Sequence, residues 1–211
     1  MYLKSILAMI VFIAAGAPLA MGAVLDQSYQ PVIDTDYNIH SYDLAQTVTA
    51  GVSGYLTEID VPVMLFPQTD MTPWEFTIRA TSGGVPTGTI LATQTLPATS
   101  IPLDFRSPLA VDFSNPAYIA AGEQYAIALR SVGFTHDVDG AGEWMGSFEV
   151  PYSGGHDFSS LDGQAFNALP GVGAPLFQTF MEAPEPSSSL AVLVFVIGVL
   201  LRRSRPGVGT R

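Results

Sequence analysis

The sequence predicts an all-β domain at residues 23–183, a two-sheet antiparallel sandwich of the jelly-roll type. Three observations predict this fold. Apolar and polar residues alternate with a period of two, as in a strand with one face in the core and one in solvent. Turn-forming residues, mainly glycine, proline and asparagine, separate the alternating runs. No segment inside the domain keeps the i, i+3, i+4 apolar spacing of a long helix.

The alternation assigns each residue of a predicted strand to one of two faces. Trp74 and Phe76 are expected in the core, whereas Thr77 and Arg79 are expected to face solvent. In residues 143–150 the same rule places Trp144, Gly146, Phe148 and Val150 on the core side. The remaining alternating runs are residues 58–65, 109–113 and 124–130.

Residues 1–22 are predicted to be a signal peptide, with a helix before the domain. Lys4 precedes an uncharged apolar run at residues 6–15. Ala20 and Gly22 then provide the small residues of a signal-peptidase site, so cleavage is expected after Gly22 or Ala23. An uncleaved membrane anchor and a buried core helix are the alternatives. The run is shorter than the roughly 20 residues that span a bilayer, and the helix breakers Gly16 and Pro18 stand where a cleavage site is expected.

Residues 184–211 are predicted to hold a transmembrane helix at residues 187–201. Basic residues that follow an apolar helix stay on the cytoplasmic side, so the preceding domain faces outward. At 1.5 Å per residue the helix is about 22 Å long, which is short for a hydrocarbon core of about 30 Å. The basic cluster after the helix consists of Arg202, Arg203 and Arg205.

Pro184, Glu185 and Pro186 stand directly before this helix. The motif, the apolar helix and the basic cluster, in this order, resemble a PEP-CTERM protein-sorting domain. The resemblance covers only residues 184–211 and implies a route rather than an activity. It implies processing by an exosortase, a membrane transpeptidase-like enzyme that cleaves near the motif. A simple tail anchor is the alternative.

The two ends together predict where the protein goes. We expect export, processing by signal peptidase and exosortase, and a transient stay in the inner membrane. The resemblance further implies a Gram-negative bacterium that makes exopolysaccharide and a biofilm matrix. The mature protein is then expected at the cell surface or in the extracellular matrix.

The domain at residues 23–183 is similar to a second group, the sandwich domains of exported PEP-CTERM proteins that are named for their choice of anchor. Those domains commonly have a tryptophan between a Gly-Gly turn and the last strand, and here Phe166 stands nearest that place. No molecular function follows from this resemblance. It rests on residues 49–51, 54–57, 84–89, 120–127, 152–155 and 177–180.

Charge and cysteine content exclude several classes of function. The chain has 19 acids, of which 18 fall in residues 23–183 together with only three bases, Arg79, Arg106 and Arg130, so the formal charge of this part is −15. Such a domain is a poor partner for nucleic acid. The absence of cysteine excludes disulfides, thiolate zinc sites and cysteine nucleophiles.

One acidic segment begins with the spacing of a calcium loop. Asp34, Asp36 and Asn38 place oxygen ligands on alternate residues. Ile39 and Ala45 stand where that loop needs a glycine and a glutamate, so no calcium site is predicted there.

A second acidic segment contains Asp137 and Asp139, with Glu143 shortly after. Calcium at Asp137 and Asp139 stays an open alternative to a solvated turn. The histidines have no zinc-ligand spacing, and we predict neither a metal nor a cofactor. The histidines are His40, His136 and His156.

No catalytic residue is predicted. The Ser53 segment lacks the second glycine of a nucleophile elbow, so a turn serine is favoured. Ser153, His156 and Asp157 are too close in sequence to suggest a triad, and their glycine-rich setting favours a turn.

Two functions remain, and a secreted hydrolase is a distant third. The first is a non-catalytic surface or matrix protein associated with exopolysaccharide. The second is a lectin-like carbohydrate-binding module with an exposed aromatic platform. Trp74 and Trp144 fall on the apolar side of their strands, which favours core packing for both. The platform candidates are Trp74, Trp144, Tyr152 and Phe158.

Overall fold

The structure is a computed structural model that describes residues 22–39, 43–66, 72–133, 142–161, 163–169 and 173–184. In this part of the chain the fold is all-β, as predicted, and each strand pairing is antiparallel. Contacts group Ala23–Ala183 into one compact unit. Helical structure within these ranges is limited to a 3-10 turn at Ala98–Ser100.

The predicted signal peptide at residues 1–22 lies outside the described ranges except for Gly22, and the predicted transmembrane helix at residues 187–201 lies wholly outside them. Within those ranges no helix has the length and apolar character needed to cross a membrane.

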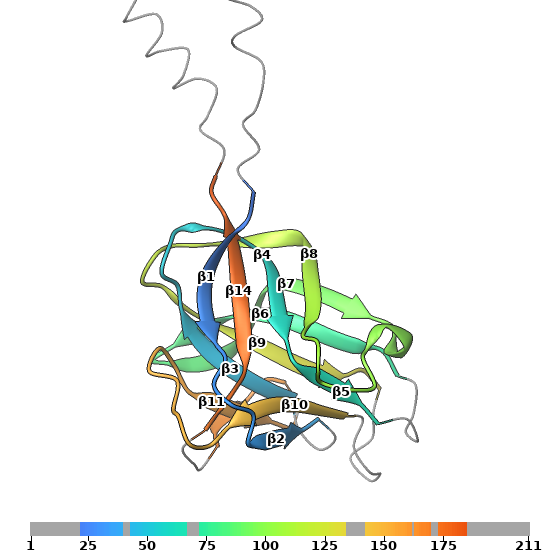
Figure 1. The fold of residues 1–211 in the computed structure, drawn as a ribbon. Coiled ribbons are helices and arrows are strands. Elements are labelled where there is room, and N and C mark those ends of the chain that lie inside the picture. Colours follow the sequence, from blue (N-terminus) through green and yellow to red (C-terminus); the bar gives the residue numbers. More distant parts are fainter. Residues whose placement is uncertain are drawn as a thin grey trace, which may run out of the picture. The chain divides into compact units, whose positions relative to one another are not determined.

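A four-stranded sheet, here called sheet A, has the strand order β1-β14-β4-β8 (Figure 1). The first and last strands of the unit are therefore neighbours. Val24 lies opposite Met181, so both ends of the compact unit leave from the same end of this sheet. The strands of sheet A are β1 (Val24–Tyr29), β14 (Phe177–Glu182), β4 (Gly54–Val61) and β8 (Leu109–Ile119).

A six-stranded sheet, here called sheet C, has the order β12-β11-β3-β9-β6-β7. Gly83 and Gly84 connect β6 to β7 with φ angles of 60° and 85°, a backbone conformation that glycine provides in tight hairpin turns. The strands of sheet C are β12 (Asn167–Ala168), β11 (Asp157–Ser160), β3 (Asp43–Thr49), β9 (Gln124–Ser131), β6 (Trp74–Ser82) and β7 (Val85–Leu96).

A small third sheet, sheet B, adds to the two that the sequence predicts. Its central strand β10 pairs with three short strands. Gly142 and Gly146 of β10 leave room for the rings of Trp74 and Tyr37, which would clash with a Cβ atom at either position. The strands of sheet B are β10 (Gly142–Ser147), β2 (Thr35–Asn38), β5 (Val63–Leu65) and β13 (Ala174–Pro175).

Sheets A and C contribute to one hydrophobic core, an arrangement consistent with a β-sandwich. Leu56 and Ile59 of β4 belong to the same buried cluster as Phe76 of β6 and Ile127 of β9. Trp74 and Trp144 are fully buried in this cluster, which confirms that both tryptophans pack in the core.

The prediction that Phe148 and Val150 face the core is wrong, because both side chains are about half exposed. β10 ends at Ser147. The Asp34 carboxylate accepts hydrogen bonds from the backbone N–H groups of Phe148 (2.6 Å) and Glu149 (3.3 Å). These bonds hold the residues after β10 in a bend, and the alternation stops there.

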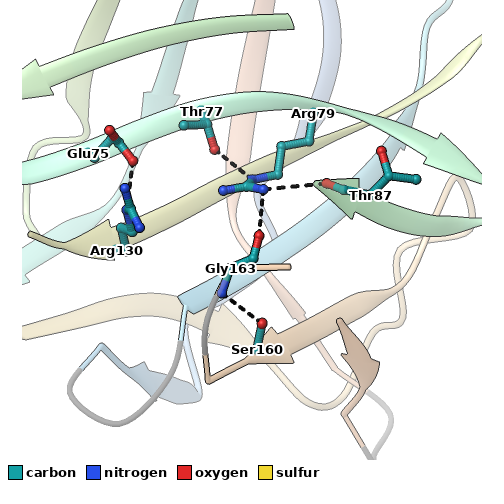
Figure 2. A network of polar contacts seen from close by, with 7 residues as sticks. All are labelled: Glu75, Thr77, Arg79, Thr87, Arg130, Ser160 and Gly163. Carbon is teal, nitrogen blue, oxygen red and sulfur yellow. Dashed lines mark hydrogen bonds and ion pairs between the residues drawn. The ribbon is translucent and has the colours of Figure 1, made fainter. Parts of the chain in front are cut away.

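The prediction that Thr77 and Arg79 face solvent is also wrong, because only 3% of Arg79 is exposed and Thr77 is buried. The Arg79 guanidinium donates to the carbonyl oxygen of Gly163 at 2.8 Å and to the hydroxyl of Thr77 at 3.0 Å (Figure 2). Residues after β11 therefore cover the part of the outer face of sheet C around Arg79, which alternation alone would leave in solvent.

A second small cluster of buried residues lies under this cover. Phe166 packs on the Arg79 guanidinium, whose Cζ lies 5.3 Å from the ring centroid. The cluster consists of Ala45, Ala128, Phe158 and Phe166.

Candidate functional site

Two exposed tyrosines lie side by side on the outer face of sheet A. Tyr55 of β4 and Tyr118 of β8 are directly opposed in the strand register. Their ring centroids are 5.5 Å apart and the rings are inclined at 72°. The neighbouring Leu56 and Ile119 are fully buried, so the two tyrosines point away from the core. Tyr55 is 41% exposed and Tyr118 is 51% exposed, which leaves aromatic surface available to a ligand.

Three carboxylates follow along the same two strands. Glu58 of β4 lies opposite Asp112 of β8, and Asp60 is two residues further along β4. Partial burial, with repulsion from Asp60 and Asp112, raises the pKa of Glu58 above its ordinary value. Partial burial also raises the pKa of Asp60. The three side chains therefore form one acidic surface next to the tyrosine pair.

A bulge in β8 separates the tyrosine pair from the carboxylates. Leu56 pairs with Ala117, but Glu58 pairs with Asp112, so β8 has three more residues than β4 between these pairs. Asn115 and Pro116 lie in this bulge, within β8. Proline lacks a backbone N–H, so a bulge is one of the few places where a strand accepts it.

The sequence misses Tyr55 and Tyr118 as candidates and selects aromatic residues that the structure places elsewhere. Trp74, Trp144 and Phe158 are buried. Tyr152 packs against Tyr29 and Phe177, with ring centroids 5.5 and 5.0 Å away. The signal that marks Tyr118 is its position between two core residues of β8, Ala117 and Ile119.

Asp34 of the first acidic segment has a structural role. Its carboxylate accepts hydrogen bonds from Ser147, Phe148 and Glu149, and these bonds hold its pKa below the ordinary value, with the Phe148 N–H as the largest cause. Residues 35–38 form β2 rather than a loop around an ion.

The second acidic segment contributes Glu143, which the structure brings next to Asp36. Burial and the neighbouring Asp36 raise the pKa of Glu143. Asp137 and Asp139 lie outside the described residues. Among the residues that the structure describes, no three acidic or histidine side chains are grouped as metal ligands would be.

The other polar candidates are found in turns or in buried contacts. The Ser53 hydroxyl accepts a hydrogen bond from the Ala121 N–H at 2.8 Å, as a turn serine does. The backbone N–H of His156 donates to the Thr47 hydroxyl at 2.8 Å. Asp157 is buried near Tyr37, and burial raises its pKa. His40 and His136 lie outside the described residues.

Three of the residues predicted for cleavage and sorting are described, and they flank the first and last strands of the unit. Gly22 and Ala23 are exposed directly before β1, and Pro184 is exposed after β14. The other residues predicted for cleavage and sorting lie outside the described ranges: Ala20, Glu185, Pro186, Arg202, Arg203 and Arg205.

No protein family model and no curated protein matches this chain.

Proposed function

We propose that this is an exported, non-catalytic protein of the cell surface or extracellular matrix, associated with exopolysaccharide. In this proposal a signal peptidase removes residues 1–22 and an exosortase processes the chain at Pro184–Pro186. The membrane helix at residues 187–201 then holds the protein only transiently in the inner membrane of a Gram-negative bacterium.

The observation that carries the sorting proposal is the order of the motif, apolar helix and basic cluster at residues 184–211. The positions of the predicted cleavage sites support it. Gly22, Ala23 and Pro184 are exposed and belong to no strand. Proline favours extended backbone in the residue before it, and this is the form that proteases bind.

The finer fold that we infer is a jelly roll. Eight strands are numbered in chain order as 1 to 8. Sheet A then has the order 1-8-3-6, and the matching part of sheet C has the order 2-7-4-5. This is the order of two interlocked Greek keys. Sheet B and the outer strands of sheet C are additions to it. The eight strands are β1, β3, β4, β6, β7, β8, β9 and β14.

Processing can be tested by measuring the intact mass of the protein from cell-surface material. We expect a mass that lacks residues 1–22 and everything after the motif. Replacing Pro184–Pro186 by alanine should leave an unprocessed form in the inner membrane. The matched control replaces Ser187, Ser188 and Ser189 by alanine and should be processed normally. Residues 190–201 on the mature wild-type protein would show that the tail is an ordinary anchor.

Carbohydrate binding by the domain itself is the second candidate function. The exposed Tyr55–Tyr118 pair favours it, because an aromatic ring with a polar hydroxyl suits a ligand that has apolar C–H faces and polar edges. Binding of this kind would also explain an association with exopolysaccharide.

A further inference from the structure

The outer face of sheet A combines two features that suit one class of ligand. The tyrosine pair offers aromatic surface on which the C–H face of a pyranose ring can pack. Glu58, Asp60 and Asp112 offer carboxylate oxygens, which accept hydrogen bonds from hydroxyl or ammonium groups. The two features lie along the same pair of strands, so one extended ligand can contact both.

The length of this face favours a chain of sugars over a single sugar. Tyr55 and Glu58 are three residues apart on β4, which corresponds to about 10 Å along a strand. A single pyranose packed on the tyrosines would not reach the far carboxylates, whereas the next sugars of a polymer would. An oligosaccharide is therefore the smallest ligand that uses the whole face.

The charge of the face selects among polysaccharides. The four strands of sheet A contain no lysine or arginine. Of the three arginines in residues 23–183, Arg79 is buried on the outer face of sheet C, Arg130 pairs with Glu75 at 2.6 Å, and Arg106 is exposed but lies outside the four strands of sheet A. Uronic-acid polymers and anionic lipid surfaces would be repelled. A cationic polymer is complementary.

We propose that Tyr55, Tyr118, Glu58, Asp60 and Asp112 form a binding site for a polysaccharide that contains amino sugars with free ammonium groups. The sugar rings pack on the two tyrosines and the ammonium groups bind the carboxylates. Ammonium near a tyrosine ring adds a cation–π attraction. This site rests on the proposed association with exopolysaccharide and names the chemistry of the polymer.

The test is calorimetric titration of the full-length protein, held in a non-ionic detergent, with a hexamer of β-1,4-linked glucosamine. The comparison ligands are the fully N-acetylated hexamer and cellohexaose, which have similar shapes and no charge. We expect the glucosamine hexamer to bind at least tenfold more tightly than either. We also expect its affinity to fall with added salt, because ion pairs at a surface are screened.

Two double variants test the residues of the proposed site. The first replaces Tyr55 and Tyr118 by alanine, and the second combines Glu58→Gln with Asp112→Asn. Each should lower the affinity for the glucosamine hexamer at least tenfold. The matched controls are Phe105→Ala, an exposed aromatic outside sheet A, and Glu149→Gln, an exposed acid outside sheet A, and both should bind as the wild type does. Circular dichroism of each variant verifies that it is folded.

Equal affinity for the three hexamers, no binding of the glucosamine hexamer, or unchanged affinity in the folded tyrosine variants would each overturn the proposed site. If the protein is nevertheless processed correctly and found in the matrix, such a binding result would leave the proposed function in place. An unprocessed protein that still binds the glucosamine hexamer would overturn the sorting route and support the site.

Discussion

The guanidinium of Arg79 on β6 donates a hydrogen bond of 2.8 Å to the carbonyl oxygen of Gly163, a residue 84 positions later in the chain. The same guanidinium bonds the Thr77 hydroxyl and contacts the Phe166 ring. The Gly163 N–H in turn donates to the Ser160 hydroxyl at 2.9 Å. One arginine thus fastens the segment after β11 onto sheet C.

Replacing Arg79 by methionine should lower the free energy of unfolding by about 2–3 kcal/mol, because the carbonyl of Gly163 would stay buried without its charged donor. Urea denaturation of residues 23–183 measures this. Arg106→Met is the matched control, since Arg106 is exposed, and it should change stability by less than about 0.5 kcal/mol. Equal effects of the two changes would show that the Arg79 network does not stabilise the fold.

The two tryptophans should respond differently to the same substitution. The indole N–H of Trp144 donates to the carbonyl of Leu176 at 2.8 Å, whereas the buried N–H of Trp74 has no partner among the described residues. Trp144→Phe leaves a buried carbonyl unsatisfied, but Trp74→Phe removes an unsatisfied donor. We expect Trp144→Phe to cost about 1–2 kcal/mol more than Trp74→Phe in urea denaturation. A larger loss for Trp74→Phe would contradict this.

Stability should rise as the pH is lowered from 8 towards about 4.5. Burial raises the pKa of Glu58, Asp60, Glu143 and Asp157 in the folded state. The fold therefore favours their protonated forms, and this stabilisation is lost as the pH rises through the raised values. Asp34 has a lowered pKa, so its contribution is lost only below its ordinary value of 3.8. The free energy of unfolding should therefore be highest at a pH that lies below the raised pKa values of the four carboxyls and above the pH at which Asp34 is protonated.

The double variant Glu58→Gln, Glu143→Gln tests whether the raised pKa values of these carboxyls cause the pH dependence of stability. With two of the raised carboxyls neutral at every pH, the free energy of unfolding should change less between pH 8 and 4.5 than in the wild type. Glu149→Gln is the control at an exposed acid and should keep the wild-type pH dependence. A double variant with the full wild-type dependence would assign the effect to other groups.

Gly155→Ala should destabilise the domain by about 2–3 kcal/mol, because overpacking forces backbone to move. A Cβ atom at this position would overlap the backbone carbonyl oxygen of Thr47. That backbone is held by the hydrogen bond from the Thr47 N–H to the His156 carbonyl at 2.9 Å. Gly51→Ala is the control, since its Cβ would meet mainly side-chain atoms of Gln27 and Asp26, and it should cost less than about 1 kcal/mol. Thermal unfolding of both variants measures and compares the two losses of stability.

The all-β fold could be predicted because period-two alternation is a local signal. The run at residues 74–81 lies in β6, and the run at residues 124–130 lies in β9. β3 shows no alternation, because Gln46 and Thr47 are buried as well as Leu44 and Val48. Its outer face is covered by residues far along the chain. This covering depends on contacts between residues that are far apart in the sequence. A local pattern of apolar and polar residues carries no information about such contacts.

The candidate site could be predicted less well, because it depends on register. Alternation can place Tyr118 outside the core, but only the pairing of β4 with β8 brings it opposite Tyr55. The bulge in β8 shifts this pairing by several residues, so Glu58 meets Asp112 rather than a residue nearer Pro116. The aromatic and acidic residues are visible in the sequence, whereas their meeting on one face is not.

The central position of β14 in sheet A has a mechanical consequence. β14 is hydrogen bonded to β1 on one edge and to β4 on the other, and it is the strand next to Pro184. Tension applied through the C-terminal end enters at Glu182 and runs parallel to the strand. The backbone bonds on both edges then carry the load in shear and must rupture together. A protein tethered at this end to a surface under flow would resist the drag with two ladders instead of one.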